Sequence, residues 1–116
     1  MLVEDERDQR ELVSEILTDN GHKVTEVDSV ESAIVELKKL ASDNNVPDVI
    51  FSDWKLGGLT GIKLLEYVRN NAIQTGFVVA TAYGSVKHAV EAIEAGADDY
   101  LAKPFQSQEL LLAITK

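Results

Sequence analysis

The chain has 116 residues, no cysteine and a formal net charge of −9 at pH 7. The absence of cysteine excludes disulfide bonds and thiolate chemistry, and no apolar run approaches the ~20 residues that a membrane span needs. The negative charge disfavours direct binding to nucleic acid or to anionic lipid, and it favours a cation or a basic partner. Because no signal peptide is visible, we expect one cytoplasmic domain over residues 1–116.

The first half of the chain alternates short apolar runs with helical patterns. A clipped strand at residues 2–3 precedes a helix over about residues 7–19. The apolar face of this helix consists of Leu12, Val13, Ile16 and Leu17. Residues 23–27 alternate like a strand, and Ser29 is a suitable cap for a second helix. The apolar run that ends on Asp53 predicts a strand over residues 49–53, buried on both faces.

The second half continues the alternation. Thr60 is a suitable cap for a third helix, and residues 77–81 predict a fourth buried strand. A fourth helix follows and is closed by Gly96. Its inward face is predicted to be Val86, Ala89, Val90 and Ile93. A fifth strand at residues 99–102 runs into Lys103, and a last helix includes Leu110.

Five strands that alternate with five helices indicate an α/β fold. Each helix has one apolar face, so each helix must cover a sheet. The alternation favours parallel strands joined by right-handed crossovers. We therefore predict a three-layer α/β/α domain around a five-stranded parallel sheet.

Charged and polar residues stand where the predicted strands end. Glu4 and Asp5 follow the first strand, and Asp53 ends the third. Thr81 ends the fourth strand, and Lys103 ends the fifth. In a parallel sheet all of these ends lie on the same edge, where ligands of open α/β sheets bind. The sequence therefore predicts one site with three carboxylates, one hydroxyl and one ammonium.

The chemistry of this site follows from its charges. Three crowded carboxylates cannot all stay ionised without help, and Mg²⁺ is a hard cation that takes oxygen ligands. With the charge relieved, Asp53 can act as a nucleophile toward phosphorus. Lys103, the hydroxyl of Thr81 and the backbone N–H groups of Trp54 and Ala82 could stabilise the phosphoryl oxygens. The pattern predicts a carboxylate that accepts a phosphoryl group.

Four segments carry a family resemblance that runs over nearly the whole chain. They are Leu2-Val3-Glu4-Asp5-Glu6, Asp48-Val49-Ile50-Phe51-Ser52-Asp53, Ala80-Thr81-Ala82 and Gly96-Ala97-Asp98-Asp99-Tyr100-Leu101-Ala102-Lys103-Pro104-Phe105. Together they resemble the receiver domain of two-component response regulators, and most of all receivers of the nitrogen-regulation type. The resemblance implies the flavodoxin-like strand order 2-1-3-4-5.

The chain departs from the family at Glu4, where Asp is more common, and at Leu56-Gly57, where Met-Pro is usual. The pair Gly57-Gly58 predicts a more flexible loop after Asp53.

The resemblance also implies roles for the residues around the acidic edge. Asp53 would be the phosphoacceptor. Asp5, Asp53 and the backbone carbonyl of Lys55 would bind Mg²⁺ directly, and Glu4 would act through a water molecule. Thr81 and Lys103 would contact the phosphoryl oxygens.

Further implied roles concern the switch and the lifetime of the phosphorylated form. Tyr100 would be the aromatic switch residue, although packing in the core is an equally good reading of it. The peptide bond between Lys103 and Pro104 would be cis. Lys55 and Tyr83 would flank the path of the hydrolytic water. Trp54 is expected beside the site, either as a packing residue or as a sensor of it.

These inferences predict a phosphorylation switch and not an enzyme with a separate substrate. A sensor histidine kinase, or a small phosphodonor, would phosphorylate Asp53. The surface formed by the fourth helix, fifth strand and fifth helix would then control an output domain or partner in transcription and would support a phosphorylation-dependent homodimer. One alternative is a phosphohydrolase with Asp53 as nucleophile, but Lys55 stands where its second acid is expected. The other is an interaction module that is never phosphorylated. His22 and His88 are expected to be exposed and receive no role, although a partner-facing surface is open as a location for His88.

Overall fold

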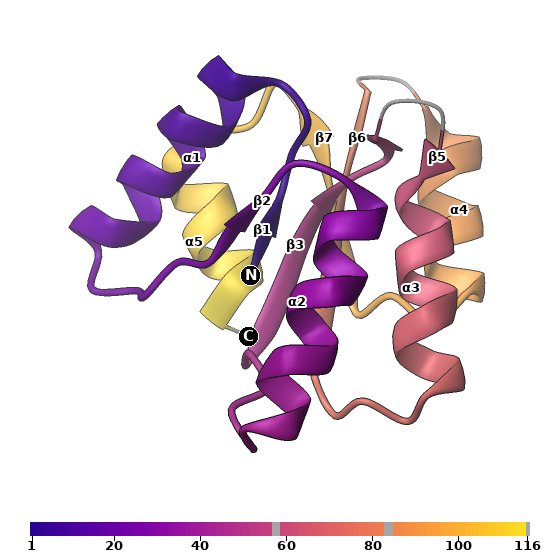
Figure 1. The fold of residues 1–116 in the computed structure, drawn as a ribbon. Helices are drawn as coiled ribbons and strands as arrows, with labels where there is room; N and C mark the ends of the chain where they lie inside the picture. The colour runs from indigo at the N-terminus through magenta and orange to yellow at the C-terminus, as the bar shows by residue number, and fades with distance from the viewer. Residues whose placement is uncertain (57–58, 83–84, 116) are drawn as a thin grey trace.

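The computed structural model describes residues 1–56, 59–82 and 85–115. The predicted residues Gly57, Gly58 and Tyr83 therefore lie outside the described residues. Within the described part, a parallel sheet of five strands has the order β2-β1-β3-β6-β7 (Figure 1). Its strands are β1 Leu2–Val3, β2 Glu26–Val27, β3 Val49–Asp53, β6 Gly76–Ala82 and β7 Asp99–Lys103. Counted along the chain, this order is the predicted 2-1-3-4-5, so the predicted flavodoxin-like fold is confirmed.

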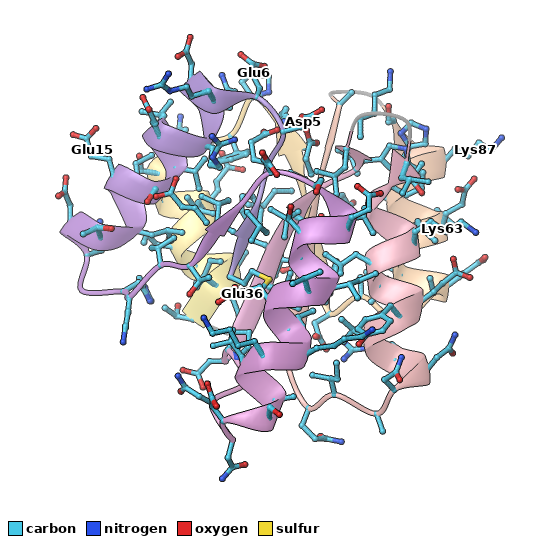
Figure 2. All side chains as sticks on the ribbon, in the orientation of Figure 1. Asp5, Glu6, Glu15, Glu36, Lys63 and Lys87 are labelled. Atoms are coloured by element: carbon cyan, nitrogen blue, oxygen red, sulfur yellow. The ribbon has the colours of Figure 1, made fainter. Side chains whose placement is uncertain are left out.

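Five described helices form the two outer layers of the domain. They are α1 Arg7–Asp19, α2 Val30–Ser42, α3 Gly61–Asn70, α4 Val86–Glu94 and α5 Ser107–Thr115. Figure 1 shows α1 and α5 on one side of the sheet and the other three helices on the opposite side. Figure 2 shows charged side chains such as Glu15, Lys63 and Lys87 pointing outward from these layers. Among the described residues, no helix is long and apolar enough to cross a membrane.

The sheet separates two apolar cores because consecutive side chains of a strand point to opposite faces. In β1, Leu2 contributes to the core under α1 and α5, whereas Val3 contributes to the core under the other three helices. In β6, Phe77 and Val79 lie in the second core and Val78 lies in the first. Both faces of the central strands are therefore buried, as their unbroken apolar runs predict.

The helix boundaries follow local capping chemistry in part. The Ser29 side chain accepts a hydrogen bond from the N–H of Ser32 at 3.0 Å, so the predicted cap of α2 is confirmed. Thr60 occupies the N-cap position of α3, but its side chain makes no capping hydrogen bond. Gly96 follows α4 with a φ of +108°, and its N–H donates to the carbonyl of Ile93 at 3.1 Å. That left-handed conformation explains why glycine stands at the end of α4.

Two strand predictions differ from the structure. The second strand is β2, which covers only Glu26–Val27 and not residues 23–27. An additional small hairpin, β4 Lys55–Leu56 paired with β5 Leu59–Thr60, lies between β3 and α3. The two-residue strands of the hairpin give too few alternating positions for the period-2 signal on which a strand prediction depends. In the second strand, the alternation extends beyond Glu26 and Val27, the residues that pair with β1.

The predicted inward face of α4 is wrong in three of its four residues. Val86, Val90 and Ile93 are 72%, 49% and 45% exposed. The buried residues of α4 are Ala89 and Ala92. The small alanine side chains let the helix backbone approach the sheet closely, and the larger aliphatic side chains then lie to the outside. Leu12 of α1 is likewise exposed, although its spacing predicts burial.

Candidate functional site

Four neighbouring strands bring the predicted site residues to one edge of the sheet. β1 pairs with β3 so that Val3 lies opposite Ser52, which places Glu4 and Asp5 beside the end of β3. β6 pairs with β3 and also with β7, where Ala82 lies opposite Lys103. All of these strands are parallel, so their carboxyl ends coincide. The predicted convergence of residues from distant parts of the chain is therefore present.

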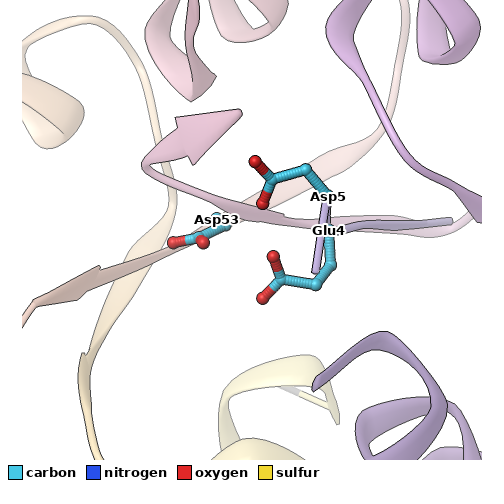
Figure 3. Close-up of side chains that lie close together, drawn as sticks. All are labelled: Glu4, Asp5 and Asp53. Atoms are coloured by element: carbon cyan, nitrogen blue, oxygen red, sulfur yellow. The ribbon is translucent and has the colours of Figure 1, made fainter. Parts of the chain in front are cut away.

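The acidic cluster consists of Glu4, Asp5 and Asp53 (Figure 3). One carboxylate oxygen from each residue lies within 4.8 Å of the other two. Glu4 is buried, Asp53 is half-buried and Asp5 is exposed. The cluster therefore opens toward solvent at Asp5 and is closed at Glu4.

Lys103 ties this cluster to the end of β7. Its Nζ lies 3.0 Å from Oδ2 of Asp53 and 3.3 Å from Oε1 of Glu4. The other oxygen of Glu4, Oε2, accepts a hydrogen bond from the N–H of Glu6 at 3.2 Å. The peptide bond from Lys103 to Pro104 is cis, as the resemblance implies. One ammonium thus bridges two of the three carboxylates.

The pKa values reflect this crowding. Burial and then the negative charge of Asp53 raise the pKa of Glu4, more than Glu6 and Lys103 lower it. Burial alone lowers the pKa of Lys103, but hydrogen bonding and the charges of Asp53 and Glu4 outweigh that effect and raise it. Lys103 therefore remains an ammonium, and it does not fully compensate the negative charge around Glu4.

The donor set of the cluster fits a hard divalent cation. Its ligand atoms are carboxylate oxygens, which Mg²⁺ and Ca²⁺ prefer. Burial and then the charge of Asp53 raise the pKa of Glu4, and a cation beside Asp5 and Asp53 would offset the second of these causes. Asp5, which is exposed, would leave room for the water molecules that Mg²⁺ retains. The predicted role of the Lys55 carbonyl as a further ligand stays a prediction.

Thr81 and Ala82 lie on β6, next to the end of β3. In the sheet register Asp53 lies opposite Ala80, so Thr81 is one residue farther toward the carboxyl end of the strands. Thr81 is buried and Ala82 is exposed. Their position is suited to donors that meet a group on Asp53, and their predicted roles stay predictions.

Trp54 makes two kinds of contact beside the site. Its N–H donates to the carbonyl of Ala80 at 2.8 Å, so this donor is already used within the sheet. That hydrogen bond argues against the predicted role of this N–H toward a phosphoryl oxygen. The indole ring is buried and stacks on His88, with ring centroids 4.3 Å apart and an interplanar angle of 10°. The expectation that His88 is exposed is therefore wrong, because its ring is half-buried against Trp54.

Tyr100 lies on β7 and points outward, with 43% of its surface exposed. The reading of Tyr100 as a core residue does not hold in this structure. Its exposed position is the starting position that an inward-turning switch residue requires. The switch itself stays a prediction.

Gly61 is a site-shaping residue that pattern reasoning missed. A Cβ added to Gly61 would lie 2.5 Å from the backbone carbonyl oxygen of Asp53 and 3.1 Å from Oγ of Ser52. Only glycine lets α3 begin this close to the phosphoacceptor candidate. The position of a glycine at a helix start, eight residues after the acid, was the available signal.

Comparison with known proteins agrees with this geometry. The chain is 40% identical to the response regulator protein FleR of Pseudomonas aeruginosa over 111 residues, which is 96% of the chain. It is 34% identical to the phosphate regulon transcriptional regulatory protein PhoB of Escherichia coli over 116 residues, which is 98% of the chain. The chain spans 22% of the length of FleR and 48% of that of PhoB.

A solved structure with the same fold is the receiver domain of NtrX from Brucella abortus. It shares 32% identity with a TM-score of 0.85, and the match covers 99% of this chain and 97% of the NtrX chain. The response regulator receiver domain family matches residues 1–115. The resemblance drawn from the four sequence segments is therefore confirmed, and the chain belongs to the family of response regulator receiver domains.

Proposed function

We propose that Asp53 accepts a phosphoryl group in a Mg²⁺-dependent reaction and that this modification switches the domain. The observation that supports it most directly is the contact network at the sheet edge. Lys103 Nζ lies 3.0 Å from Asp53, and Glu4 and Asp5 place further carboxylate oxygens around it. A receiver domain in which these groups converge is suited to phosphoryl transfer.

The proposed step is a displacement at phosphorus. A carboxylate oxygen of Asp53 attacks the phosphorus atom of a phosphohistidine or of a small phosphodonor such as acetyl phosphate. The bond from phosphorus to the donor's leaving atom breaks, and the electron pair leaves with that atom. Bound at Asp5 and Asp53, Mg²⁺ would supply charge neutralisation for the transferred group.

The remaining stabilisation comes from groups of this chain. Lys103 moves from its contact with the Asp53 carboxylate to the new phosphoryl oxygens, which carry more charge. The hydroxyl of Thr81 and the N–H of Ala82 donate hydrogen bonds from the neighbouring strand. Glu4, held by Lys103 and by the N–H of Glu6, would act on a bound Mg²⁺ through a water molecule.

The proposed readout is a shift between two populations of the domain. Thr81 moves toward the phosphoryl group, and Tyr100, now exposed, turns into the space that Thr81 vacates. The surface of α4, β7 and α5 then changes its affinity for an output domain, a partner protein or a second copy of the chain. A sensor histidine kinase is the proposed phosphodonor, and transcription is the proposed output.

Two alternatives remain distinct from this proposal. A phosphohydrolase would need an acid near the nucleophile, and the exposed Lys55 stands at that position. A module without phosphorylation would have no need for an ammonium that bridges two buried or half-buried carboxylates. Neither alternative accounts for the whole network, so we propose no separate enzymatic turnover beyond the chain's own phosphorylation and dephosphorylation.

The decisive experiment is incubation with acetyl phosphate and Mg²⁺, followed by intact-mass measurement. We expect a single phosphoryl adduct that is absent with chelator and absent in Asp53→Asn. The exposed acid variant Asp43→Asn should be modified like the parent chain. Continuous release of product from an ester would support the hydrolase instead, and the absence of any adduct would support the module.

We further propose that Lys55 and Tyr83 set the lifetime of the phosphorylated form by flanking the path of the attacking water. Lys55 follows Asp53 by two residues, and Tyr83 follows Thr81 by two residues. A bulky side chain at position 83 should slow water, so Tyr83→Ala should dephosphorylate faster. An unchanged decay of the adduct in Tyr83→Ala would reject this role.

A further inference from the structure

The contact between Trp54 and His88 joins two segments that follow neighbouring strands at the edge of the sheet where Asp53 lies. Trp54 follows β3, and α4, which carries His88, follows β6. Trp54 directly follows Asp53, and His88 lies in the first turn of α4. Their rings are nearly parallel, with centroids 4.3 Å apart and an interplanar angle of 10°. Parallel rings at this distance make a contact with a defined geometry and not only a shared apolar volume.

Trp54 is held firmly at its own end of this contact. Its N–H donates to the carbonyl of Ala80 at 2.8 Å, and its carbonyl accepts from the N–H of Gly61 at 2.7 Å. The indole is 7% exposed. A displacement of the backbone at Asp53 would therefore also displace the indole ring of Trp54.

α4 is held weakly by its other contacts. Its buried residues are Ala89 and Ala92, whose side chains are single methyl groups. Val86, Val90 and Ile93 are exposed, and the N-cap Ser85 makes no side-chain capping hydrogen bond. The ring of His88 is therefore a large anchor for the first turns of a helix that is otherwise attached through small side chains.

Stacking on Trp54 is the contact of the His88 ring that the described residues show. Its Nδ1 is buried and has no hydrogen-bond partner among the described residues. A buried polar atom without a partner is unfavourable, so an apolar ring would pack at least as well there. Ring stacking and simple filling of space predict different substitutes for His88. If stacking positions the ring, Phe should replace His88 and Leu should not; if filled space is enough, both should replace it.

We propose that His88 is a positioning residue that couples the state of the Asp53 site to the position of α4 through Trp54. This inference rests on the proposed function of Asp53. Binding or modification at Asp53 shifts Trp54, and the stacked ring of His88 transmits that shift to the first turn of α4. The proposal assigns a role to a histidine that neither the acidic cluster nor the proposed phosphoryl transfer uses.

The test measures amide hydrogen exchange of residues 86–94 in the full chain in three states: with chelator, with Mg²⁺, and with Mg²⁺ and acetyl phosphate. In His88→Ala the start of the hydrogen-bonded part of α4, from the N–H of Ala89 onward, should exchange about fivefold faster with chelator, as loss of one ring-stacking contact predicts. Its response to Mg²⁺ and to phosphorylation should be lost. His88→Phe should restore both the slow exchange and the response, whereas His88→Leu, which fills space without a planar ring, should not.

A second readout comes from Trp54, the only tryptophan in the chain. Its emission maximum should shift to longer wavelength in His88→Ala, because the indole becomes hydrated, and should remain in place in His88→Phe. Lys87→Ala is the matched control, since Lys87 precedes His88 on α4 and points into solvent (Figure 2). It should leave both readouts unchanged.

The outcomes separate this inference from the proposed function. If the wild-type chain forms the adduct and His88→Ala or His88→Leu keeps the wild-type response of α4, the coupling is overturned and phosphorylation of Asp53 stands. If no adduct forms, the proposed function fails. The coupling is then tested by the change in hydrogen exchange of α4 between chelator and Mg²⁺. If His88→Phe behaves like His88→Ala, the stack is not what positions α4.

Discussion

At the scale of single residues, the site depends on an unequal balance of charge. Glu4, Asp5 and Asp53 contribute three carboxylates, and Lys103 contributes the ammonium that bridges Glu4 and Asp53. Burial makes this imbalance matter, because a charge removed from water is poorly screened. Two predictions follow from the carboxylates that Lys103 contacts.

Asp53→Asn should stabilise the metal-free domain. The substitution removes one negative charge from beside the buried Glu4 and keeps the shape of the side chain. We expect the melting temperature in chelator to rise by about 2–6 °C, the change that a free-energy gain near 1 kcal/mol produces in a domain of this size. Asp43→Asn, at an exposed carboxylate after α2, should melt like the parent. A lower melting temperature for Asp53→Asn would mean that Lys103 already overcompensates the carboxylates.

Glu4→Gln should change how stability depends on pH. Burial and the charge of Asp53 raise the pKa of Glu4 above its usual 4.5, so the folded chain keeps a proton that the unfolded chain has lost. Between pH 4.5 and the raised pKa of Glu4, the free energy of unfolding therefore falls as the pH rises. Without metal, Glu4→Gln should match the parent near pH 4.5 and exceed it at pH 7 in thermal melts. Glu15→Gln on α1 is the control, and a parallel pH profile for Glu4→Gln would contradict the assignment.

At the scale of elements, α3 and α4 approach the site in different ways. α3 begins at Gly61, against the backbone of Asp53, and its position is enforced by close contact. α4 approaches through alanines and through the ring of His88, and it leaves three aliphatic side chains exposed. The first arrangement restricts the position of α3 by backbone contact, and the second restricts α4 only through side chains.

Gly61→Ala should disturb the site through the backbone. Its Cβ would lie 2.5 Å from the carbonyl oxygen of Asp53, so the start of α3 or the end of β3 must shift. We expect a loss of about 1–3 kcal/mol in the free energy of unfolding and slower adduct formation with acetyl phosphate. Urea denaturation and intact-mass time courses measure the two effects. Lys63→Ala, an exposed position in the same turn (Figure 2), should change neither.

Substitutions on α4 should separate its exposed side from its buried side. Val90→Lys lies on the exposed side and should change the free energy of unfolding by no more than about 0.5 kcal/mol. Ala92→Leu forces a large side chain into a fully buried position and should cost about 1–3 kcal/mol. Chemical denaturation of both variants measures the difference. A large loss in Val90→Lys would show that this side is covered in solution.

At the scale of the whole molecule, the site draws its carboxylates from the middle of the sheet and its ammonium from β7, the strand at one side of the sheet. β1 and β3 are interior strands of the five-stranded order, and the cluster residues follow them directly. A cation bound there would contact only the folded chain, because the unfolded chain does not bring Asp5 and Asp53 together. Binding should therefore raise global stability.

Magnesium should raise the melting temperature in a concentration-dependent manner. At a free concentration about 100 times the dissociation constant, a one-site ligand adds about 2.7 kcal/mol. Asp5→Asn should lose most of this gain, and NaCl at matched ionic strength should not reproduce it. Equal stabilisation of the parent and of Asp5→Asn would place the cation elsewhere.

Several features could be predicted from residue order alone because their causes are local. The alternation of apolar runs and helical patterns predicts a parallel α/β sheet, and parallel strands must end on one edge. The convergence of Glu4, Asp5, Asp53 and Lys103 follows from that topology, and the contacts of Lys103 agree with it. The strand order itself was supplied by the family resemblance.

Other features depend on contacts between distant segments and could not be predicted locally. The helical period of α4 identifies an apolar arc, but the packing partner selects which part of that arc is buried, and here it selects Ala89 and Ala92. The stack of His88 on Trp54 and the close approach of Gly61 to Asp53 likewise require two chain segments to meet. The fold class, the acidic edge and the candidate phosphoacceptor could be predicted from residue order, because periodicity and strand ends are properties of neighbouring residues. The covered face of α4 and the ring that touches the site could be identified only in the folded chain, because they depend on the shapes of surfaces that come together on folding.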